Sequence, residues 1–415
     1  MADVIIIGGG IVGLSSAYYL TKAGYKVTVL DKDEIVGNCS YGNAGMIVPS
    51  HFVPLATPGM VKQGIKWMFN SKSPFYVRPS LNMNLVKWGL QFLRSSNEKH
   101  VENSAIPLRD FSLLSKQLIN DLAKDPDFNF ELENKGILAF YKTEKVAEEE
   151  AELCAKAVEL GLEMKVLNLE ECKKLQPNLD LDVLGAVHYQ CDSHIYPAAL
   201  MQNLQDYLLK NGVGILKKSA VTAFQMESDK ILSVMVGNKE FKADHFVLAT
   251  GSWSTQVAKL AGENISIMPG KGYSFEETVG NESITIPALL CEARVAITPM
   301  NGKIRFGGTM ELDRVNNKIN IDRVKGIVES VPKYFPQVKP NLPELNKIWF
   351  GFRPASPDGL PYIGRSKHKK NLIIATGHGM MGLSLGQATG KLVCEIISEQ
   401  PLSMPLAPFA VNRFS

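Results

Sequence analysis

The sequence is poor in the features that mark several large protein classes. Its six cysteines are scattered, with no C-x-x-C pair among them, so neither a zinc site nor a disulfide framework is expected. No apolar run approaches the roughly 18 residues that a membrane-spanning helix requires. The formal net charge of +3 is too small to indicate nucleic acid as a partner. No basic leader with a cleavage site precedes the first strand, so we expect no signal peptide and a cytoplasmic protein whose cysteines stay reduced.

A second shortage is local, because no acidic residue occurs between Glu34 and Glu98. Aromatic residues are interleaved in this stretch with six basic ones: Lys62, Lys66, Lys72, Arg78, Lys87 and Arg94. Basic and aromatic side chains on short amphipathic segments are typical of contact with an anionic membrane surface. A packed pair of helices whose lysines extend along apolar neighbours would have the same composition. The stretch leaves both interpretations open, peripheral contact with the inner face of a membrane and ordinary helix packing.

The first 31 residues contain the strongest positive signal, ADVIIIGGGIVGLSSAYYLTKAGYKVTVLD. An apolar run, a glycine cluster, a helical pattern and a second strand ending in Asp31 follow one another here. Gly8, Gly10 and Gly13 fit the G-x-G-x-x-G pattern, whose glycines permit a tight turn, close approach of a pyrophosphate and close helix packing. The helix N-terminus offers N–H groups to the phosphates, and Asp31 can accept hydrogen bonds from ribose hydroxyls. This stretch predicts a dinucleotide site.

The order of the later elements predicts that the nucleotide domain is interrupted. Residues 37–59 are rich in Gly, Ser, Asn and Pro and are typical of a loop, where a simple dinucleotide domain would continue with a strand and a helix. Helices are expected at 84–95, 104–124, 143–160, 197–212 and 321–332, and antiparallel strands over 266–311. The expected fold is mixed α/β: a Rossmann-like domain (1–90, 191–260 and 346–415) interrupted by a substrate domain with a mostly antiparallel sheet (91–190 and 261–345). Such an interruption favours FAD over a nicotinamide cofactor.

Two further glycine-rich turns follow buried strands. VLATGSWS, residues 247–254, ends in a turn beside small polar residues. IATGHGMMGLSLGQATG carries Gly377, Gly379 and Gly382 just ahead of a helix. This second helix N-terminus would stabilise the negative charge of a reduced flavin.

One arginine and one strand supply candidates for substrate binding. Arg353, in GFRPASPDGLPYIG, needs an anion, which is either a structural aspartate such as Asp358 or a substrate carboxylate held by both guanidinium nitrogens. Lys271 and Tyr273, in MPGKGYSFE, share a strand, so Tyr273 can donate a hydrogen bond to the same anion. Lys271 would favour a reduced flavin anion or its reaction with oxygen if it points at the ring.

Four histidines lie close to these motifs. His51 and His378 are candidates for the pocket, and His188 and His194 occur in the stretch HYQCDSHIYPAAL. Each is either a substrate-side residue or a solvated or structural histidine, and the sequence leaves both interpretations open.

Together these stretches resemble the D-amino-acid dehydrogenase branch of the glycine/D-amino-acid oxidase family of FAD enzymes. The resemblance runs almost end to end and includes YGNAGMIVPSHFVPLATPGMVKQGIKWMF, KGYSF, GFRPASPDGLPYIGR and ATGHGMMGLSLGQATG. It implies non-covalent FAD, with SYGNAGM against the isoalloxazine, Val221 at the adenine, Thr250 and Gly251 at the pyrophosphate, and Arg353 on a substrate carboxylate. The residues expected to bind the cofactor are Gly8, Gly10, Ile11, Val12, Gly13, Asp31, Lys32, Ser40, Asn43, Ala44, Gly45, Met46, Val221, Thr250, Gly251, Trp253, Gly379, Met380, Met381, Gly382 and Leu383.

The resemblance implies oxidation of a D-amino acid, or of a cyclic imino acid such as D-proline or a hydroxyproline. A hydride would pass from Cα to flavin N5, and water would hydrolyse the resulting imine to a 2-oxo acid. The electrons would go to a quinone or another membrane acceptor. The alternatives are an oxidase that uses oxygen, an FAD dehydrogenase of a 2-hydroxy acid, a flavoprotein with a structural role, and an NAD enzyme. No metal is expected.

Overall fold

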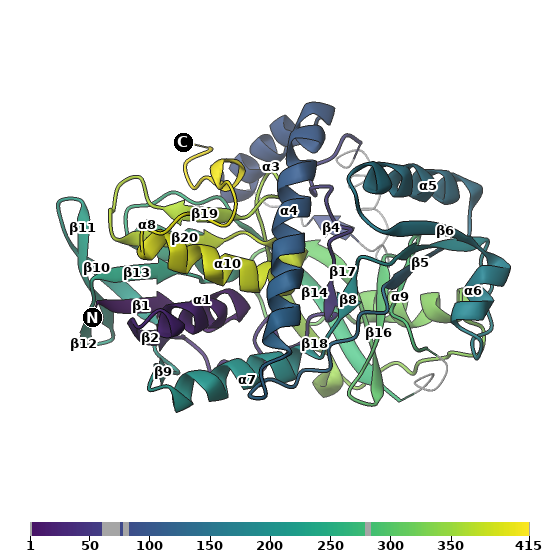
Figure 1. The fold of residues 1–415 in the computed structure, drawn as a ribbon, viewed down its shortest axis with the longest axis horizontal. Helices are drawn as coiled ribbons and strands as arrows, with labels where there is room; N and C mark the ends of the chain where they lie inside the picture. The colour runs from purple at the N-terminus through teal and green to yellow at the C-terminus, as the bar shows by residue number, and fades with distance from the viewer. Residues whose placement is uncertain (1, 60–74, 78–82, 279–283, 415) are drawn as a thin grey trace.

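The computed structural model describes residues 2–59, 75–77, 83–278 and 284–414. Two large sheets lie at the left and right of the molecule in Figure 1, and the long helix α4 (Glu98–Leu122) runs between the two halves on the near side. Lys62, Lys66, Lys72 and Arg78, the first four basic residues of the acid-free stretch, lie outside the described residues. No helix in the described part of the chain is long and apolar enough to cross a membrane.

Six described strands form the first sheet, which is parallel apart from one edge strand. Their order is β19 (Tyr362–Arg365), β20 (Leu372–Thr376), β13 (His245–Leu248), β1 (Asp3–Ile7), β2 (Lys26–Leu30) and β9 (Gly214–Leu216), with only the β19–β20 pair antiparallel. β1 is apolar on both faces because both are covered. Val4 and Ile6 pack with α1 (Ile11–Lys22), α7 (Pro197–Lys210) and α10 (Gly382–Ile397). Ile5 and Ile7 pack against the opposite layer.

That opposite layer is a small three-stranded sheet and a short helix. β10 (Val221–Glu227), β11 (Lys230–Val236) and β12 (Lys239–Lys242) are antiparallel, and α8 (Ser254–Leu260) packs beside them. The three strands form the left edge of the molecule in Figure 1. The expected β-α-β start and the loop at 37–59 are both confirmed; the loop contains one two-residue strand, β3 (Met46–Ile47), which pairs with β8 (Ser193–His194).

Nine described strands form the second sheet, which is mostly antiparallel. The order is β18 (Trp349–Ala355), β14 (Met268–Glu277), β17 (Lys303–Leu312), β16 (Val295–Met300), β15 (Ala288–Leu290), β5 (Ile137–Tyr141), β7 (Gly185–Tyr189) and β6 (Met164–Asn168), and β4 (Phe75–Val77) pairs with β17. Only the β15–β5 and β17–β4 pairs are parallel. The helices α5 (Glu144–Glu159), α6 (Leu169–Leu175) and α9 (Ile321–Ser330) pack around this sheet. The mixed α/β fold class is confirmed.

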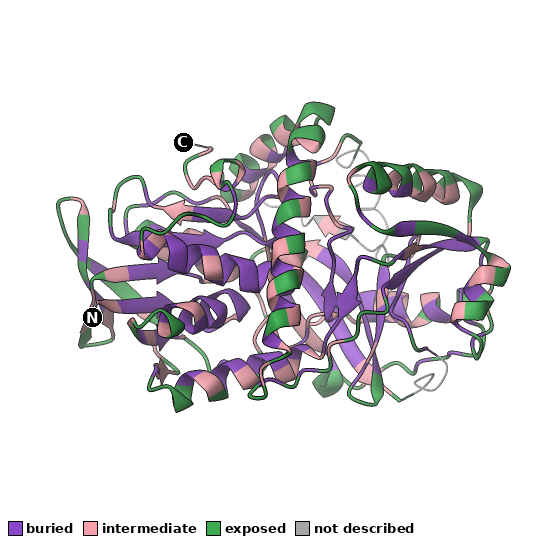
Figure 2. Cartoon of the chain, viewed as in Figure 1, coloured by how far each residue is buried: buried purple, intermediate pink, exposed green. Residues whose placement is uncertain are grey.

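The helix α4 joins the two halves. Its Leu108 and Phe111 pack against Leu385 and Ala388 of α10. In Figure 2 the near side of α4 alternates between exposed and intermediate residues, whereas α1 and α10 to its left are mostly buried. α4 begins at Glu98 rather than at residue 104 as expected, because the Asn97 side chain caps it by accepting a hydrogen bond from the His100 N–H.

Sheet membership crosses the domain boundaries expected from the sequence. β4 (within 1–90) and β18 (within 346–415) belong to the nine-stranded sheet, although both were expected in the nucleotide domain. α4 (within 91–190) packs on α10 beside the six-stranded sheet. The remaining expected helices are confirmed, including α3 (Met83–Ser95), and their bounds agree with the expectation to within two residues at each end.

Candidate active site

One continuous cavity of about 1270 Å³ opens between the two large sheets. One wall is made by the carboxyl ends of β1, β2 and β13 and by the start of α1, and the other by residues of β14, β17 and β18. The loop after β2 and the turn before α10 also line it. The carboxyl end of a parallel sheet is where α/β folds bind nucleotides, so the cavity lies where the glycine motif predicts.

The three motif glycines are needed for different reasons. Gly8 has φ +112°, and a Cβ there would lie 2.4 Å from the Ala249 carbonyl oxygen, so this turn passes directly against the end of β13. A Cβ on Gly13 would lie 1.9 Å from the Gly8 carbonyl oxygen, because α1 packs tightly on the turn. A Cβ on Gly10 would meet only Ser40 Oγ, at 3.6 Å, and Gly10 lines the cavity. Gly10 therefore leaves room for a ligand, whereas Gly8 and Gly13 serve the fold.

Two helix N-termini open on this cavity. α1 begins after Gly10 and α10 after Met381, and neither helix has a side-chain cap or an acidic residue in its first turn. At the start of α1 the Ile11 N–H donates to Ser40 Oγ at 3.0 Å. The other N–H groups of the first turn and the positive end of each helix dipole favour an anion at both points. The sequence predicted both termini, one for phosphates and one for the charge of a reduced flavin.

Asp31 and Lys32 line the cavity just after β2 ends. The Asp31 carboxylate accepts hydrogen bonds from the Gly9 N–H at 2.6 Å and the Asp33 N–H at 2.8 Å, and each oxygen keeps a second lone pair for a ligand. Lys32 Nζ lies 4.2 Å from the centre of the Trp253 ring. This part of the cavity therefore offers carboxylate acceptors beside an aromatic face.

Nearly all of the predicted cofactor residues line the cavity; the exceptions are Gly13 and Gly45. Gly45 has φ +79°, and a Cβ on it would lie 2.4 Å from the Ile195 carbonyl oxygen, so it is required by the packing of the loop. The predicted residues that do line it are Gly8, Gly10, Ile11, Val12, Asp31, Lys32, Ser40, Asn43, Ala44, Met46, Val221, Thr250, Gly251, Trp253, Gly379, Met380, Met381, Gly382 and Leu383.

Arg353 brings a positive charge to the cavity with no carboxylate partner among the described residues. It extends from β18 over Gly272, where a Cβ would lie 2.2 Å from Arg353 Nη1, and it donates to the Thr309 carbonyl. Burial lowers the pKa of Arg353 to about 10, so the guanidinium is still charged at neutral pH. Asp358, the structural partner that the sequence left open, binds Arg413 instead, at 2.6 Å. A half-buried cation on a cavity wall, without a carboxylate partner among the described residues, favours an anion from outside the chain.

Lys271 and Tyr273 of β14 point to one face of the sheet, and Arg353 of the neighbouring strand β18 points to the other. Lys271 Nζ donates to Asn316 Oδ1 at 2.6 Å, and the Tyr273 hydroxyl donates to Glu311 Oε2 at 3.2 Å. The glycine between them faces Arg353, because successive residues of a strand alternate between faces. Tyr273 does line the cavity, as predicted, but its hydroxyl is engaged with Glu311 on the other face of the sheet, so a joint grip of one carboxylate with Arg353 does not fit this geometry. Lys271 is not among the residues that line the cavity, so its expected role beside a flavin has no geometric support.

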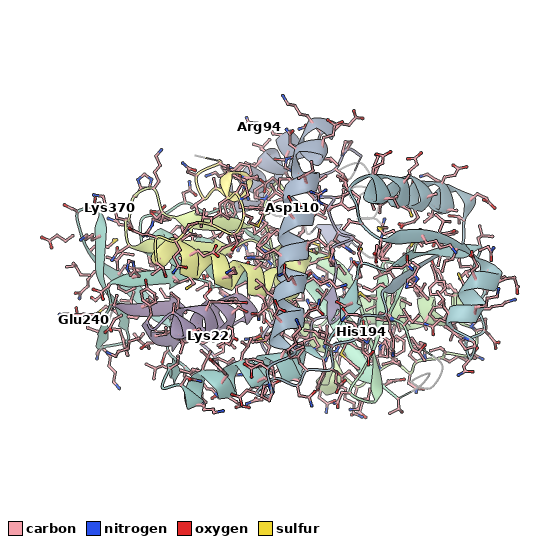
Figure 3. The ribbon with its side chains drawn as sticks, viewed as in Figure 1. Lys22, Arg94, Asp110, His194, Glu240 and Lys370 are labelled. Carbon is pink, nitrogen blue, oxygen red and sulfur yellow. The ribbon has the colours of Figure 1, made fainter. Side chains whose placement is uncertain are left out.

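His51 and His378 line the cavity, whereas His188 and His194 do not. The Nε2 of His378 is hydrogen-bonded to Thr389 Oγ1 at 2.9 Å, so the ring is turned into α10, and burial lowers its pKa to about 3. His194 lies to the right of α4 in Figure 3, and burial lowers its pKa to about 4. His51 keeps a ring nitrogen for a ligand, because its Nε2 has no partner in the described part of the chain.

The comparison with protein families matches residues 3–396 to the DAO family, described as FAD dependent oxidoreductase. The chain belongs to this family. Curated relatives of this oxidoreductase include the D-amino acid dehydrogenase of Helicobacter pylori, 30% identical over 95% of this chain and 94% of that protein. Another is the D-amino acid dehydrogenase of Vibrio atlanticus, 30% identical over 99% of this chain and 100% of that protein. Among solved structures, glycine oxidase from Geobacillus kaustophilus superimposes with a TM-score of 0.78 at 21% identity, covering all of both chains.

FAD is the cofactor of this oxidoreductase, and the cavity fits it on observations that do not depend on the comparison. Gly10 leaves open space at the start of α1, and a second uncapped helix N-terminus lies on the same cavity. Asp31 holds acceptor oxygens on the cavity wall, as ribose hydroxyls require. The resemblance inferred from the sequence is confirmed.

The sequence analysis missed Arg305, a buried arginine of this oxidoreductase that holds the loop after β2. Arg305 of β17 forms an ion pair with Glu276 and donates from Nη1 to the carbonyls of Tyr41 and Asn43. It thus anchors the loop predicted to lie against the isoalloxazine. The signal was an arginine within an otherwise uncharged run, IRFGGTM, whose length and apolar residues are typical of a strand buried on both faces.

Proposed function

We propose that this oxidoreductase is a D-amino-acid dehydrogenase that binds FAD non-covalently and oxidises the Cα–N bond of its substrate. The observation that carries the proposal is Arg353, a charged guanidinium on the cavity without a carboxylate partner in the described chain. An amino-acid carboxylate is the anion that a two-pronged guanidinium binds best. The names of the relatives in Helicobacter pylori and Vibrio atlanticus support the same substrate class.

When bound, FAD supplies the acceptor for a hydride from the substrate Cα. The chain itself contributes position and environment. Arg353 holds the carboxylate and so fixes the direction of the Cα–H bond. Its contact with the Thr309 carbonyl limits the freedom of the guanidinium. The apolar residues of the cavity, among them Val48, Val53 and Leu289, keep water from the reacting carbon.

We assign the cofactor to the part of the protein built on the six-stranded sheet. This part also contains α1, α4, α7, α10 and the β10–β12 layer. We assign the substrate to the part built on the nine-stranded sheet. The motif glycines and Asp31 support the first assignment. Arg353 on β18 supports the second. Two other reactions would use the same arginine: oxidation of a 2-hydroxy acid, and amino-acid oxidation with oxygen as acceptor.

The proposed function is tested by adding amino acids to the yellow protein without air. D-isomers, including D-proline and a D-hydroxyproline, should bleach the flavin absorbance near 450 nm, and the matching L-isomers should leave it unchanged. Bleaching by L-isomers or by 2-hydroxy acids alone would reject the proposal. Admission of air then distinguishes the acceptors, because rapid return of the colour identifies an oxidase and slow return a dehydrogenase.

We further propose that the electron acceptor is a membrane quinone, reached from the cytoplasmic surface through α3. Four apolar side chains on one face of this helix, Met83, Val86, Leu90 and Leu93, are each 46% to 76% exposed. Trp88 and Phe92 hold the opposite face against the protein. The exposed Lys87 and Arg94 flank the apolar face, and Arg94 lies at the upper edge of the molecule in Figure 3. Apolar side chains flanked by cations match an anionic lipid surface.

The double variant Leu90→Ser/Leu93→Ser should bind vesicles of phosphatidylglycerol and phosphatidylcholine at least about tenfold more weakly than the parent, because two leucines no longer enter the lipid. Co-sedimentation at low and high salt measures this. The matched control is Leu209→Ser/Leu232→Ser, which removes two leucines of 56% and 46% exposure elsewhere on the surface. Equal loss in both variants, or no binding by the parent, would reject α3 as the contact.

A further inference from the structure

A buried carboxylate lies behind His51, one hydroxyl away from the cavity. Asp192, between β7 and β8, is fully buried and accepts a hydrogen bond from Ser50 Oγ at 2.6 Å and another from the Ser50 N–H at 3.0 Å. Ser50 Oγ in turn lies 3.1 Å from His51 Nδ1. His51 lines the cavity. The three side chains thus form one hydrogen-bonded line from the cavity wall to a carboxylate that has no contact with solvent.

The donors in this line fix the form of the histidine. Ser50 has one hydroxyl proton, and at 2.6 Å from a carboxylate oxygen that proton is donated to Asp192. Ser50 Oγ is then the acceptor toward His51, so Nδ1 carries the imidazole proton and Nε2 carries the lone pair. Burial lowers the pKa of His51 to about 4, which keeps the ring neutral at physiological pH. A neutral base therefore lies on the wall of the substrate cavity.

The charges around the line favour movement of a proton toward Asp192. Burial raises the pKa of the Asp192 carboxyl to about 7, against the lowering effect of the Ser50 bonds, so Asp192 is a stronger base than an ordinary aspartate. Lys116 of α4, bonded to the Cys191 carbonyl, and the Cys191 thiol also face Asp192. Tyr189 is a further titratable neighbour of Asp192, and Arg294 is the charged group beside His51. The positive field of Arg294 disfavours a proton that stays on the imidazole.

We propose that His51, Ser50 and Asp192 form a proton relay that removes the ammonium proton of the bound substrate. The inference rests on the proposed function, since only an amine substrate brings this proton. An N–H bond of the ammonium breaks as His51 Nε2 gains the proton, Nδ1 passes its own proton to Ser50, and Ser50 passes its proton to Asp192. No electrons are gained or lost by the relay. The product is a neutral amine, whose lone pair can assist departure of the hydride from Cα.

The relay predicts a pH dependence with a defined direction. Asp192 must be ionised to accept a proton, so the rate constant for anaerobic flavin bleaching by D-alanine or D-proline should rise as the pH increases through about 7. Asp192→Asn should lower this rate constant by about 100-fold or more and remove the rise, because general bases contribute that much. His51→Ala should do the same and recover part of the rate when imidazole is added.

Infrared spectroscopy supplies a readout that does not depend on turnover. Addition of D-alanine to the dithionite-reduced holoenzyme should produce a protonated-carboxyl band, whereas propionate, which lacks the amine, should not. The band should be absent from Asp192→Asn and weakened in Ser50→Ala. Ser193→Ala is the matched control, because Ser193 adjoins Asp192 and its buried Oγ makes no hydrogen bond to the described chain. This control should retain both the band and the pH profile.

The possible failures are separable. If no D-amino acid bleaches the parent protein, the proposed function fails and the relay fails with it. If the parent is bleached but Asp192→Asn keeps the pH profile, or if propionate produces the same band, the relay alone is overturned. If Asp192 only holds the loop through the Ser50 N–H, Asp192→Asn should lower thermal stability, and added imidazole should not restore the rate of His51→Ala. That result would also overturn the relay.

Discussion

Replacement of Arg353 by alanine should raise the KM for a D-amino acid by roughly 30-fold to several thousandfold, because losing one partner of a buried charge pair costs about 2–5 kcal/mol. The purified variant should still carry FAD, since the glycine turn, Asp31 and the N-terminus of α1 belong to elements other than β18. Arg353→Lys should recover only part of the affinity, because an ammonium cannot hold both carboxylate oxygens in a planar fork. Steady-state kinetics and the ratio of flavin to protein absorbance measure the two effects.

Arg294→Ala is the informative control for this result. Arg294 also lines the cavity, but it is exposed and lies beside His51. Its loss should change KM by less than about tenfold, as is typical of exposed charges. An unchanged KM in Arg353→Ala together with a large rise in Arg294→Ala would transfer the carboxylate site to the other arginine.

Gly10→Ala should abolish FAD binding without unfolding the protein, whereas Gly13→Ala should disrupt the fold itself. A Cβ on Gly10 meets only Ser40 Oγ, at 3.6 Å, and otherwise enters the space required by the pyrophosphate. A Cβ on Gly13 would lie 1.9 Å from the backbone oxygen of Gly8. This clash could be relieved only by moving the backbone, because no flexible side chain is involved. Such overpacking costs about 1–3 kcal/mol or more, a large share of a typical net stability.

The two variants are compared by flavin content and by thermal unfolding of the protein stripped of FAD. Gly10→Ala should lose the yellow colour with an unchanged melting temperature of the stripped form. Gly13→Ala should lose the yellow colour, and the melting temperature of its stripped form should fall. Gly89→Ala in α3, where an added Cβ meets no atom within 4 Å, should keep the flavin and gain a few tenths of a kcal/mol or more of stability. Retention of FAD by Gly10→Ala would remove this glycine from the phosphate site.

Local patterns were sufficient to predict much of this fold. The glycine spacing, the apolar period of α1 and the acid at Asp31 all belong to one short segment whose parts contact each other directly. The position of Arg353 on the cavity was also predicted, because a single arginine between apolar and turn residues needs an anion. The expected domain boundaries were less informative, because β4 and β18 join the nine-stranded sheet through pairings with distant strands.

The parts of the site that sequence could not supply depend on long-range pairing. Period-two alternation places Lys271 and Tyr273 on the same face of β14, but the register with β18 decides that Arg353 lies on the other one. Asp192 and Ser50 are 142 positions apart, so nothing local connects the acid to His51. His378 was predicted to act in the pocket, and its bond to Thr389 is visible only once α10 is folded.

The strand order of the six-stranded sheet also bears on how the protein is made in the cell. β1 pairs with β13, and β13 pairs with β20. The sheet that contains β1 therefore cannot be completed until β20, which begins at Leu372, has been synthesised. At about 5–20 residues per second, roughly 20–80 s of translation separate the two. α10, which supplies the second helix N-terminus, emerges later still. We therefore expect flavin to bind after the ribosome has finished most of the chain, and the apolar β1 to need protection from aggregation until then.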